Sequence, residues 1–431
     1  MIFMCFHTIY DKFSDLIKSA EKKGFFHLFL ANALIQLFGF GSQFLVAWFL
    51  DVEELGQIKI IQTYFSVAVM FSTFGFNTSV LKLCSESRPY GQKIYLYRKA
   101  LQYAVIAICI VLPIVVIATQ SGLISSDLKV QKYFLYVLFA LGPSTLDNIF
   151  SSYLQSQKKF KLLSRINIST KILSVICIII FTWLYRFDGY IIGYILGFLF
   201  SFLMLTIGIK KTNFGSLPEQ VNKPFKNHTR YSIWALVVNM IGLIGSYTDV
   251  FLMNYLIVDK EAIGFYSFAL TILLVMTMFR STVCQFIVPY FSEKSNDIIQ
   301  LQIVSKKYEL INIVSTTIIA IALFFLVPPL VKLFFGNKFL ESIPLFRILI
   351  WGEVFYSVIN FKGYTMLGLG AIKSNFITSA ISVTSGFVIT YLFVQNLGIQ
   401  GLAYGKVINS FISIFIVNIV YRITINQYRK K

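Results

Sequence analysis

The sequence is poor in charge: only 13% of its 431 residues are Asp, Glu, Lys or Arg, about half the share of an ordinary soluble domain. Its five cysteines form no CxxC pair and its three histidines lie far apart, which argues against structural zinc and a disulfide framework. The chain also lacks a phosphate-binding loop, a GxSxG elbow and an HExxH motif. We therefore expect neither a water-soluble enzyme nor a catalytic residue, a metal or another cofactor.

Apolar residues dominate instead. They make up 57% of the chain, enough to fill about twelve transmembrane helices of about 20 residues each. Such segments must be helical, because lipid offers backbone groups no hydrogen-bond partner. Hydropathy predicts an all-α polytopic membrane protein with twelve transmembrane helices near 26–50, 57–82, 100–120, 131–156, 163–185, 188–210, 230–256, 262–289, 308–328, 343–368, 373–395 and 398–422.

Residues 1–24 precede the first apolar segment and do not resemble a signal peptide, since no cationic segment leads and no small-residue cleavage site follows. Ile9, Phe13, Leu16 and Ile17 fall on one helical face, with the lysines elsewhere. This pattern predicts an amphipathic helix at the membrane surface on the cytoplasmic side.

The net charge of +19 would suggest nucleic acid on a soluble protein. With both termini placed in the cytoplasm, however, 28 basic residues fall on the cytoplasmic side and eight on the outside. This bias follows the positive-inside rule and explains the charge without a nucleic-acid partner.

The chain also repeats itself. Glu54-Leu55-Gly56 and Ala262-Ile263-Gly264 each precede an apolar segment that ends in Ser-Glu, and Gly189-Tyr-Ile-Ile-Gly193 corresponds to Gly401-Leu-Ala-Tyr-Gly405. We expect two pseudo-symmetric six-helix bundles of the same orientation. The expected domains are a cytoplasmic N-terminal helix (1–24), an N-terminal bundle (25–211), a cytoplasmic linker (212–229), a C-terminal bundle (230–425) and a cytoplasmic tail (426–431).

Polar residues three or four positions apart form one stripe on each of three segments. The stripes comprise Asn32, Gln36, Gly39 and Gln43; Lys59, Thr63, Ser66, Met70, Thr73 and Asn77; and Asn239, Gly242, Ser246, Asp249 and Met253. One stripe alone would be interpreted as polar contacts between helices. Three stripes in corresponding places favour the walls of a water-accessible central cavity.

Ionisable residues inside apolar segments are costly and often functional. Asp147 and Lys171 lie at similar depth and are expected to pair. Glu353 and Lys406 either pair likewise or act separately. Arg280 has no obvious partner except Asp249, which lies at a different depth, so we favour a functional role for Arg280.

Several degenerate motifs occur together in a specific order. They are Val52-Glu53-Glu54-Leu55-Gly56, Phe74-Gly75-Phe76, Tyr153-Leu154-Gln155-Ser156-Gln157, Ser246-Tyr247-Thr248-Asp249-Val250-Phe251-Leu252, Ile263-Gly264-Phe265-Tyr266-Ser267-Phe268-Ala269, Val288-Pro289 and Met366-Leu367-Gly368-Leu369-Gly370. Across essentially its whole length, the chain resembles polysaccharide flippases of the O-antigen type. These belong to the superfamily of multidrug and oligosaccharidyl-lipid/polysaccharide exporters.

The resemblance implies two bundles around a central cavity, in the bacterial inner membrane. It also implies transport of an isoprenoid-diphosphate-linked oligosaccharide to the outer leaflet, for O-antigen (lipopolysaccharide) or capsule biosynthesis. A polysaccharide polymerase and a chain-length regulator are the implied partners, besides the substrate and membrane lipid. Arg280 suits the diphosphate by charge and geometry. The other candidates for substrate binding are Lys59, Asp249, Asn32, Gln36, Gln43, Ser66, Asn77, Asn239 and Ser246.

The main alternative is a cation-coupled multidrug exporter of the same superfamily. Such exporters tend to have a carboxylate inside the first transmembrane segment, whereas Glu21 and Asp51 only flank it here. Asp249 and Glu353 are nevertheless candidates for binding a coupling ion. A lipid-precursor flippase for peptidoglycan would resemble a chain with fourteen transmembrane segments, and a glycosyltransferase would need larger outer loops.

Overall fold

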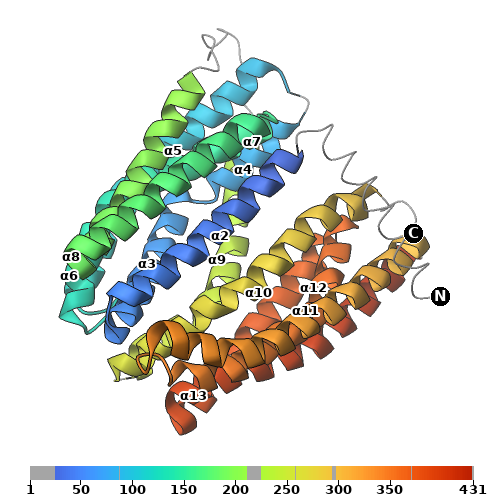
Figure 1. Ribbon diagram of the computed structural model, residues 1–431. Coiled ribbons are helices and arrows are strands. Elements are labelled where there is room, and N and C mark those ends of the chain that lie inside the picture. The colour runs from blue at the N-terminus through green and yellow to red at the C-terminus, as the bar shows by residue number, and fades with distance from the viewer. Residues whose placement is uncertain are drawn as a thin grey trace. The chain divides into compact units, whose positions relative to one another are not determined.

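The protein is built of helices, as the apolar segments predict (Figure 1). The computed structural model describes residues 25–86, 88–210, 225–257, 259–293, 298–369 and 371–429, and this part of the chain contains no strand. The expected amphipathic helix at 1–24 lies outside the described residues, and so does most of the expected linker at 212–229.

Each of the predicted apolar segments falls within helical structure. The helices are α2 (Phe25–Phe49), α3 (Val52–Thr73), α4 (Phe76–Ser85), α5 (Tyr90–Gln120), α6 (Leu128–Val137), the 3₁₀ turn η1 (Leu138–Ala140), α7 (Leu141–Ser156), α8 (Phe160–Lys210), α9 (Phe225–Leu256), α10 (Lys260–Glu293), α11 (Ile298–Phe335), α12 (Ser342–Gly368) and α13 (Ile372–Arg429). Several helices begin before the predicted apolar segment that they contain. α5 starts at Tyr90 and α11 at Ile298, because a helix can continue through polar residues outside the lipid.

Seven of the described helices are long and apolar enough to cross a membrane, or eight if the bent pair α3 and α4 forms one span. The chain is therefore a multi-pass membrane protein. α8 and α13 each consist of two helices joined at a kink, at Arg186 (φ 51°) and Gly398 (φ 55°). Each of them thus holds two of the predicted segments. The count of twelve and the two-bundle symmetry stay predictions.

The repeated glycines have a physical reason at these two kinks. A Cβ added at Gly189 would lie 1.8 Å from the Phe181 carbonyl oxygen, and one at Gly401 would lie 2.1 Å from that of Phe393. Gly193 and Gly405 also lie against the preceding helix, since an added Cβ would lie 2.7 Å from the Cα atom of Ile178 and 2.6 Å from that of Thr390. The Gly-x-x-x-Gly motif lets the two arms of each long helix cross in contact.

The predicted continuous segment 57–82 is wrong in detail, because the chain bends by 51° between α3 and α4. Phe74 and Gly75 have positive φ angles of 47° and 69°, which end the regular helix. A Cβ at Gly75 would lie 2.2 Å from the Ser232 carbonyl oxygen, so only glycine fits the bend. The segment 131–156 is likewise interrupted, by η1.

The helices group into two compact units. Unit 1 comprises the described residues within Met1–Ser42, Ala68–Ile114 and Val137–Leu236; unit 2 comprises Gln43–Val67, Val115–Tyr136 and Val237–Lys431. The core of unit 1 lies among α4, α5, α7 and α8 and includes Val80, Leu96, Ile149 and Leu205, each fully buried. In unit 2, α12 is central and packs against α10, α11 and α13.

A buried histidine fixes the start of α9 within unit 1. The Ser79 hydroxyl lies 2.7 Å from Nδ1 of His228, and Nε2 of that ring lies 3.1 Å from the Leu96 carbonyl oxygen. The ring also packs edge-on against Phe76. His228 therefore has its polar atoms satisfied inside the protein and serves packing.

At one end of unit 2, the starts of α3 and α10 cross closely. A Cβ at Gly264 would lie 1.9 Å from the Val52 carbonyl oxygen, and one at Gly56 would lie 3.0 Å from the Gly264 nitrogen. The two repeat-related motifs that end in Gly56 and Gly264 thus contact one another. Glycine is required at both places because the backbones themselves touch.

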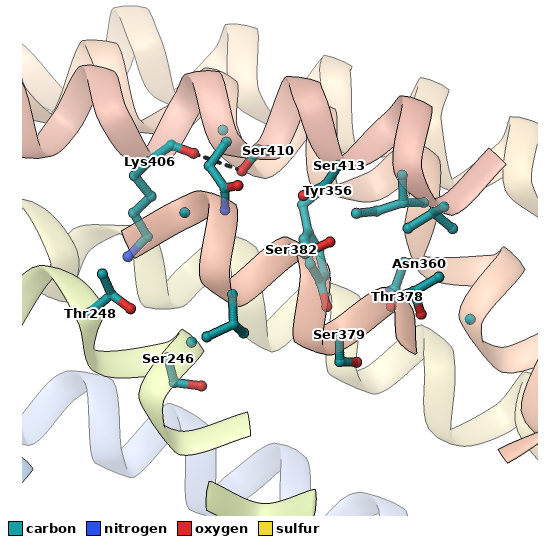
Figure 2. Close-up of a pocket in the computed structure, with 18 of the residues that line it drawn as sticks. Ser246, Thr248, Tyr356, Asn360, Thr378, Ser379, Ser382, Lys406, Ser410 and Ser413 are labelled. Atoms are coloured by element: carbon teal, nitrogen blue, oxygen red, sulfur yellow. Dashed lines mark hydrogen bonds between the residues drawn. The ribbon is translucent and has the colours of Figure 1, made fainter. Parts of the chain in front are cut away.

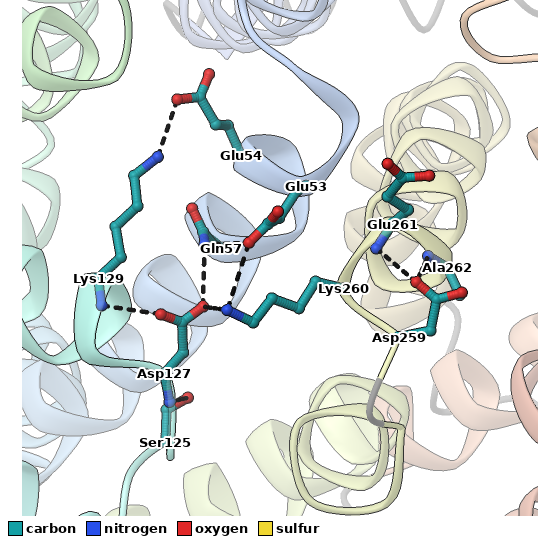
Figure 3. A network of polar contacts seen from close by, with 10 residues as sticks. All are labelled: Glu53, Glu54, Gln57, Ser125, Asp127, Lys129, Asp259, Lys260, Glu261 and Ala262. Carbon is teal, nitrogen blue, oxygen red and sulfur yellow. Dashed lines mark hydrogen bonds and ion pairs between the residues drawn. The ribbon is translucent and has the colours of Figure 1, made fainter.

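Charged side chains surround this crossing (Figure 3). Lys260 Nζ lies 3.1 Å from Asp127 Oδ2, and Gln57 donates a hydrogen bond of 2.9 Å to the same oxygen. Lys129 pairs with Glu54 at 2.9 Å. Burial alone would raise the pKa of the Asp127 carboxyl, but the hydrogen bonds from Lys260, Gln57 and a backbone N–H outweigh it and lower that pKa. The network ties the loop before α6 to the starts of α3 and α10.

Candidate functional site

A polar pocket lies inside unit 2, in the C-terminal half of the sequence. Its volume is about 520 Å³, within the range of about 300–1,000 Å³ typical of small-molecule sites. It is lined mainly by α9, α12 and both arms of α13. Most of its polar lining consists of hydroxyl and amide side chains, several of which are labelled in Figure 2.

Helical periodicity explains how the pocket forms. Glu353, Tyr356, Asn360 and Gly363 succeed each other on α12 at intervals of three or four residues, which places them on one face. The first arm of α13 contributes Asn375, Thr378, Ser379, Ser382 and Gly386 in the same way, and its second arm contributes Lys406, Asn409, Ser410 and Ser413. Three polar faces thus meet in one space.

A buried ion pair closes one side of the pocket. Lys406 Nζ lies 2.7 Å from Asp249 Oδ2, and the Asp249 side chain is only 5% exposed. The Tyr266 hydroxyl donates to the same carboxylate at 3.1 Å, and the Val250 N–H donates to its other oxygen at 3.0 Å. Asp249 is therefore fully engaged by three donors, whereas the Lys406 side chain keeps 39% of its surface exposed.

This pair corrects our expectations for the charged residues inside the apolar segments. The partner considered for Lys406 was Glu353, whereas the structure pairs Lys406 with Asp249 on α9, 157 positions away. Lys59 of α3 lies within electrostatic range of the same carboxylate. The Arg280 side chain lies outside the described residues.

The expected pair of Asp147 and Lys171 is wrong. Asp147 accepts a hydrogen bond of 2.6 Å from Ser201 on the second arm of α8. Lys171, on the first arm, extends toward α2 instead, where its Nζ lies 3.6 Å from the place a Cβ on Gly39 would occupy. Within the described residues, Lys171 forms no ion pair.

The structure brings three of the sequence-predicted site residues into the pocket: Ser246, Asp249 and Glu353. Ser246 is exposed, and its hydroxyl donates to the Gly242 carbonyl oxygen at 2.8 Å. Asn239, one turn before Gly242 on α9, is half-buried and does not line the pocket. The stripe on α9 thus faces the pocket only at its centre.

The predicted residues of α2, α3 and α4 do not line this pocket. In unit 2, Gln43 accepts a long hydrogen bond of 3.4 Å from Thr271, Ser66 donates to the Gln62 carbonyl oxygen, and Lys59 is half-buried. In unit 1, Gln36 and Asn77 are half-buried. Asn77 Oδ1 is inaccessible and has no hydrogen-bond partner among the described atoms. The Asn32 side chain lies outside the described residues.

Sequence reasoning missed most of the pocket, namely the polar faces of α12 and α13. The same spacing of three and four residues that marked the stripe on α9 is present there and would have revealed them. A metal site is not suggested by the described residues, since no three of their His, Cys, Asp and Glu side chains converge.

Comparison with known protein families identifies the family of the chain. A family model described as "Polysaccharide biosynthesis protein" matches residues 22–295, more than half of the chain. No curated protein matches the sequence significantly.

Solved structures give the fold. A multidrug resistance MATE family transporter of the MOP superfamily, in an inward-facing conformation, superposes with a TM-score of 0.76 at 12% identity, covering 94% of this chain and 95% of its own. The lipid II flippase MurJ, in an inward closed conformation, gives 0.75 at 19% identity, covering 91% and 86%. The Vibrio cholerae MATE transporter VcmN, in its bent form, gives 0.63 at 16% identity, covering 96% and 98%. At these identities the likeness establishes a shared helical membrane fold.

Proposed function

Because the chain belongs to the family of polysaccharide biosynthesis proteins, we propose that it is a flippase for a lipid-linked oligosaccharide. The substrate is an isoprenoid-diphosphate-linked repeat unit, carried from the cytoplasmic to the outer leaflet of a bacterial inner membrane. The product serves the assembly of a surface polysaccharide, O-antigen or capsule. The protein performs no covalent chemistry in this role.

The observation that carries the proposal is the polar pocket within membrane-spanning helices. Hydroxyl, amide and charged side chains are costly in lipid unless they meet protein, water or a polar substrate. In this chain they converge from α9, α12 and α13 on a space of about 520 Å³. A sugar headgroup has the hydroxyl groups that such a lining can bind, while the isoprenoid tail can stay in lipid.

The proposal includes the architecture predicted from hydropathy and repeats. Twelve spans form an N-terminal bundle (25–211) and a C-terminal bundle (230–425), with both termini in the cytoplasm. Arg280 is the proposed ligand of the diphosphate, supported by its place inside a membrane-spanning helix. A polysaccharide polymerase and a chain-length regulator are the proposed partners downstream.

A cation-coupled multidrug exporter is the second candidate, favoured by the fold shared with the MATE family transporter. Its coupling ion would need a carboxylate with room for a cation. Asp249, one of the two candidates, already holds the Lys406 ammonium at 2.7 Å, which speaks against an exchangeable ion there. Glu353 remains the other candidate within the pocket.

Deletion of the gene tests the proposal. We expect the mutant to lose one surface polysaccharide and to accumulate its lipid-linked repeat unit facing the cytoplasm, and a plasmid copy to restore both. Drug susceptibility of the same strains separates the two candidates. Increased drug susceptibility with normal surface polysaccharide would favour the exporter and refute the flippase.

A further inference from the structure

The pocket in unit 2 differs chemically from a site for an anion. We propose that it holds the uncharged sugars of the transported headgroup, hexoses or N-acetylhexosamines, and excludes the diphosphate and acidic sugars. The inference rests on the proposed function and specifies which part of the substrate this pocket binds.

The charges of the pocket disfavour an anionic ligand. Its charged lining residues are Asp249, Glu353 and Lys406, which carry a formal net charge of −1. The single cation lies against a carboxylate at 2.7 Å, so its field is largely cancelled at the pocket. A diphosphate, itself an anion, would meet a lining of net negative formal charge, which repels it.

Lys406 is also held by Asp249 and does not turn away from it to bind an anion. Asp249 is 5% exposed, and the ammonium is its only cationic partner at contact distance among the described residues. Turning Lys406 toward a phosphate would strand a buried carboxylate, which is strongly unfavourable. The pair therefore forms a fixed wall of the pocket and not an anion site.

The uncharged lining matches sugar hydroxyls, which both donate and accept hydrogen bonds. The hydroxyl protons of Ser246 and Ser410 already go to carbonyl oxygens of their own helices, so both oxygens face a ligand as acceptors. The Asn409 side chain is held by the Ser385 hydroxyl, which donates to its Oδ1 at 3.0 Å. That contact leaves the Asn409 amide NH₂ as a donor, beside Gly386, where a Cβ would lie 2.6 Å from it.

Tyr356 adds an apolar surface. Its side chain lines the pocket from α12 and is 41% exposed, next to the hydroxyl-bearing face of α13 that includes Ser382 (Figure 2). A ring of this kind packs on the C–H face of a pyranose, while neighbouring hydroxyl and amide groups bind its edge. Hydroxyls, amides and one exposed aromatic ring are the groups that recognise an uncharged sugar.

The test measures binding by the full-length protein in nanodiscs. Three synthetic probes share one short polyprenyl diphosphate: the bare lipid, the lipid with an uncharged N-acetylhexosamine disaccharide, and the lipid with a disaccharide containing a uronic acid. The wild-type protein should bind the uncharged glycolipid more tightly than either of the others.

Two variants locate the sugar. Tyr356→Ala and Ser382→Ala should each weaken binding of the uncharged glycolipid about three- to tenfold, the effect of one or two neutral contacts, and leave the bare lipid unchanged. Tyr391→Ala and Thr384→Ala are the matched controls, because both residues are exposed on α13 and do not line the pocket. They should change neither affinity.

Unchanged binding of the bare lipid also shows that each variant is folded. Binding of all three probes with equal affinity by the wild-type protein would overturn the inference alone and leave the flippase proposal standing. If Tyr356→Ala or Ser382→Ala lost as much affinity for the bare lipid as for the uncharged glycolipid, the diphosphate would lie in the pocket and the inference would be overturned too. Failure of the wild-type protein to bind any probe would overturn both.

Discussion

Removing the cation of the buried pair should destabilise the protein strongly. Lys406→Met keeps the length of the side chain and leaves the Asp249 carboxylate, 5% exposed, without its ammonium. Breaking a buried ion pair typically costs about 3–5 kcal/mol. The lower end, about 3 kcal/mol, is expected here, because Lys406 is 39% exposed and Tyr266 and Val250 still donate to the carboxylate.

The double variant supplies the test of this reasoning. Asp249→Asn combined with Lys406→Met removes both charges and leaves a neutral amide with imperfect hydrogen bonds, for a cost of about 1 kcal/mol. Unfolding by SDS titration in mixed micelles, followed by tryptophan fluorescence, measures all four proteins of the cycle. If Lys406→Met were as stable as the wild type, or the double variant no more stable than Lys406→Met, the ion pair would not determine the stability of the protein as we describe.

Three further predictions concern the diphosphate ligand, the topology and the network at one end of unit 2. Arg280→Ala should abolish polysaccharide export at an unchanged protein level and Arg280→Lys should reduce it partially, whereas normal export by Arg280→Ala would remove Arg280 as a ligand. A reporter active only in the cytoplasm should be active within 211–230 and inactive near Asp127, and the opposite result at 211–230 would refute the proposed orientation. Asp127→Asn should cost about 1 kcal/mol at pH 7, since Lys260 is half-exposed. Because the native pKa of Asp127 lies below the unfolded value of about 3.9, this contribution is present above the unfolded pKa and is lost as pH falls through the native pKa. The stability difference between the two proteins should therefore shrink on acidification, and a difference that grows as pH falls would contradict the lowered pKa.

The helices were predictable because lipid leaves so little choice. A run of apolar residues long enough to cross a membrane must satisfy its own backbone, and each predicted segment is indeed helical. The interruptions were not predictable from hydropathy. The bend at Phe74 and Gly75 depends on the approach of the Ser232 carbonyl oxygen, a contact between segments far apart in the sequence.

The glycine repeats were predictable as a pattern but not as a contact. Gly189 and Gly401 recur at corresponding places, and the structure explains why: each allows a helix to cross the one before it. The contact of Gly56 with Gly264 has a different origin, since it joins the two repeats to each other. A repeat in sequence indicates equivalent positions, and it does not tell which equivalent positions touch.

Partners of buried charges are the least predictable feature. Depth along a helix suggested Asp147 for Lys171, but the rotation of each helix about its axis decides the contact and directs Asp147 to Ser201. Lys406 and Asp249 were both conspicuous as charges within apolar segments, yet their pairing depends on the packing of α9 against α13. The polar faces of α12 and α13 were visible in the sequence, at the same spacing as the stripe on α9.

Transport in a purified system tests the central claim most directly. The full-length protein is reconstituted into vesicles that contain a polyprenyl-diphosphate-linked oligosaccharide, and a membrane-impermeant glycosidase reports the fraction of headgroups on the outside. We predict that the accessible fraction rises from the outer-leaflet half toward completion with the wild-type protein, and stays at half in protein-free vesicles. An accessible fraction that stays at half with folded wild-type protein would contradict the proposal that this protein moves lipid-linked oligosaccharides.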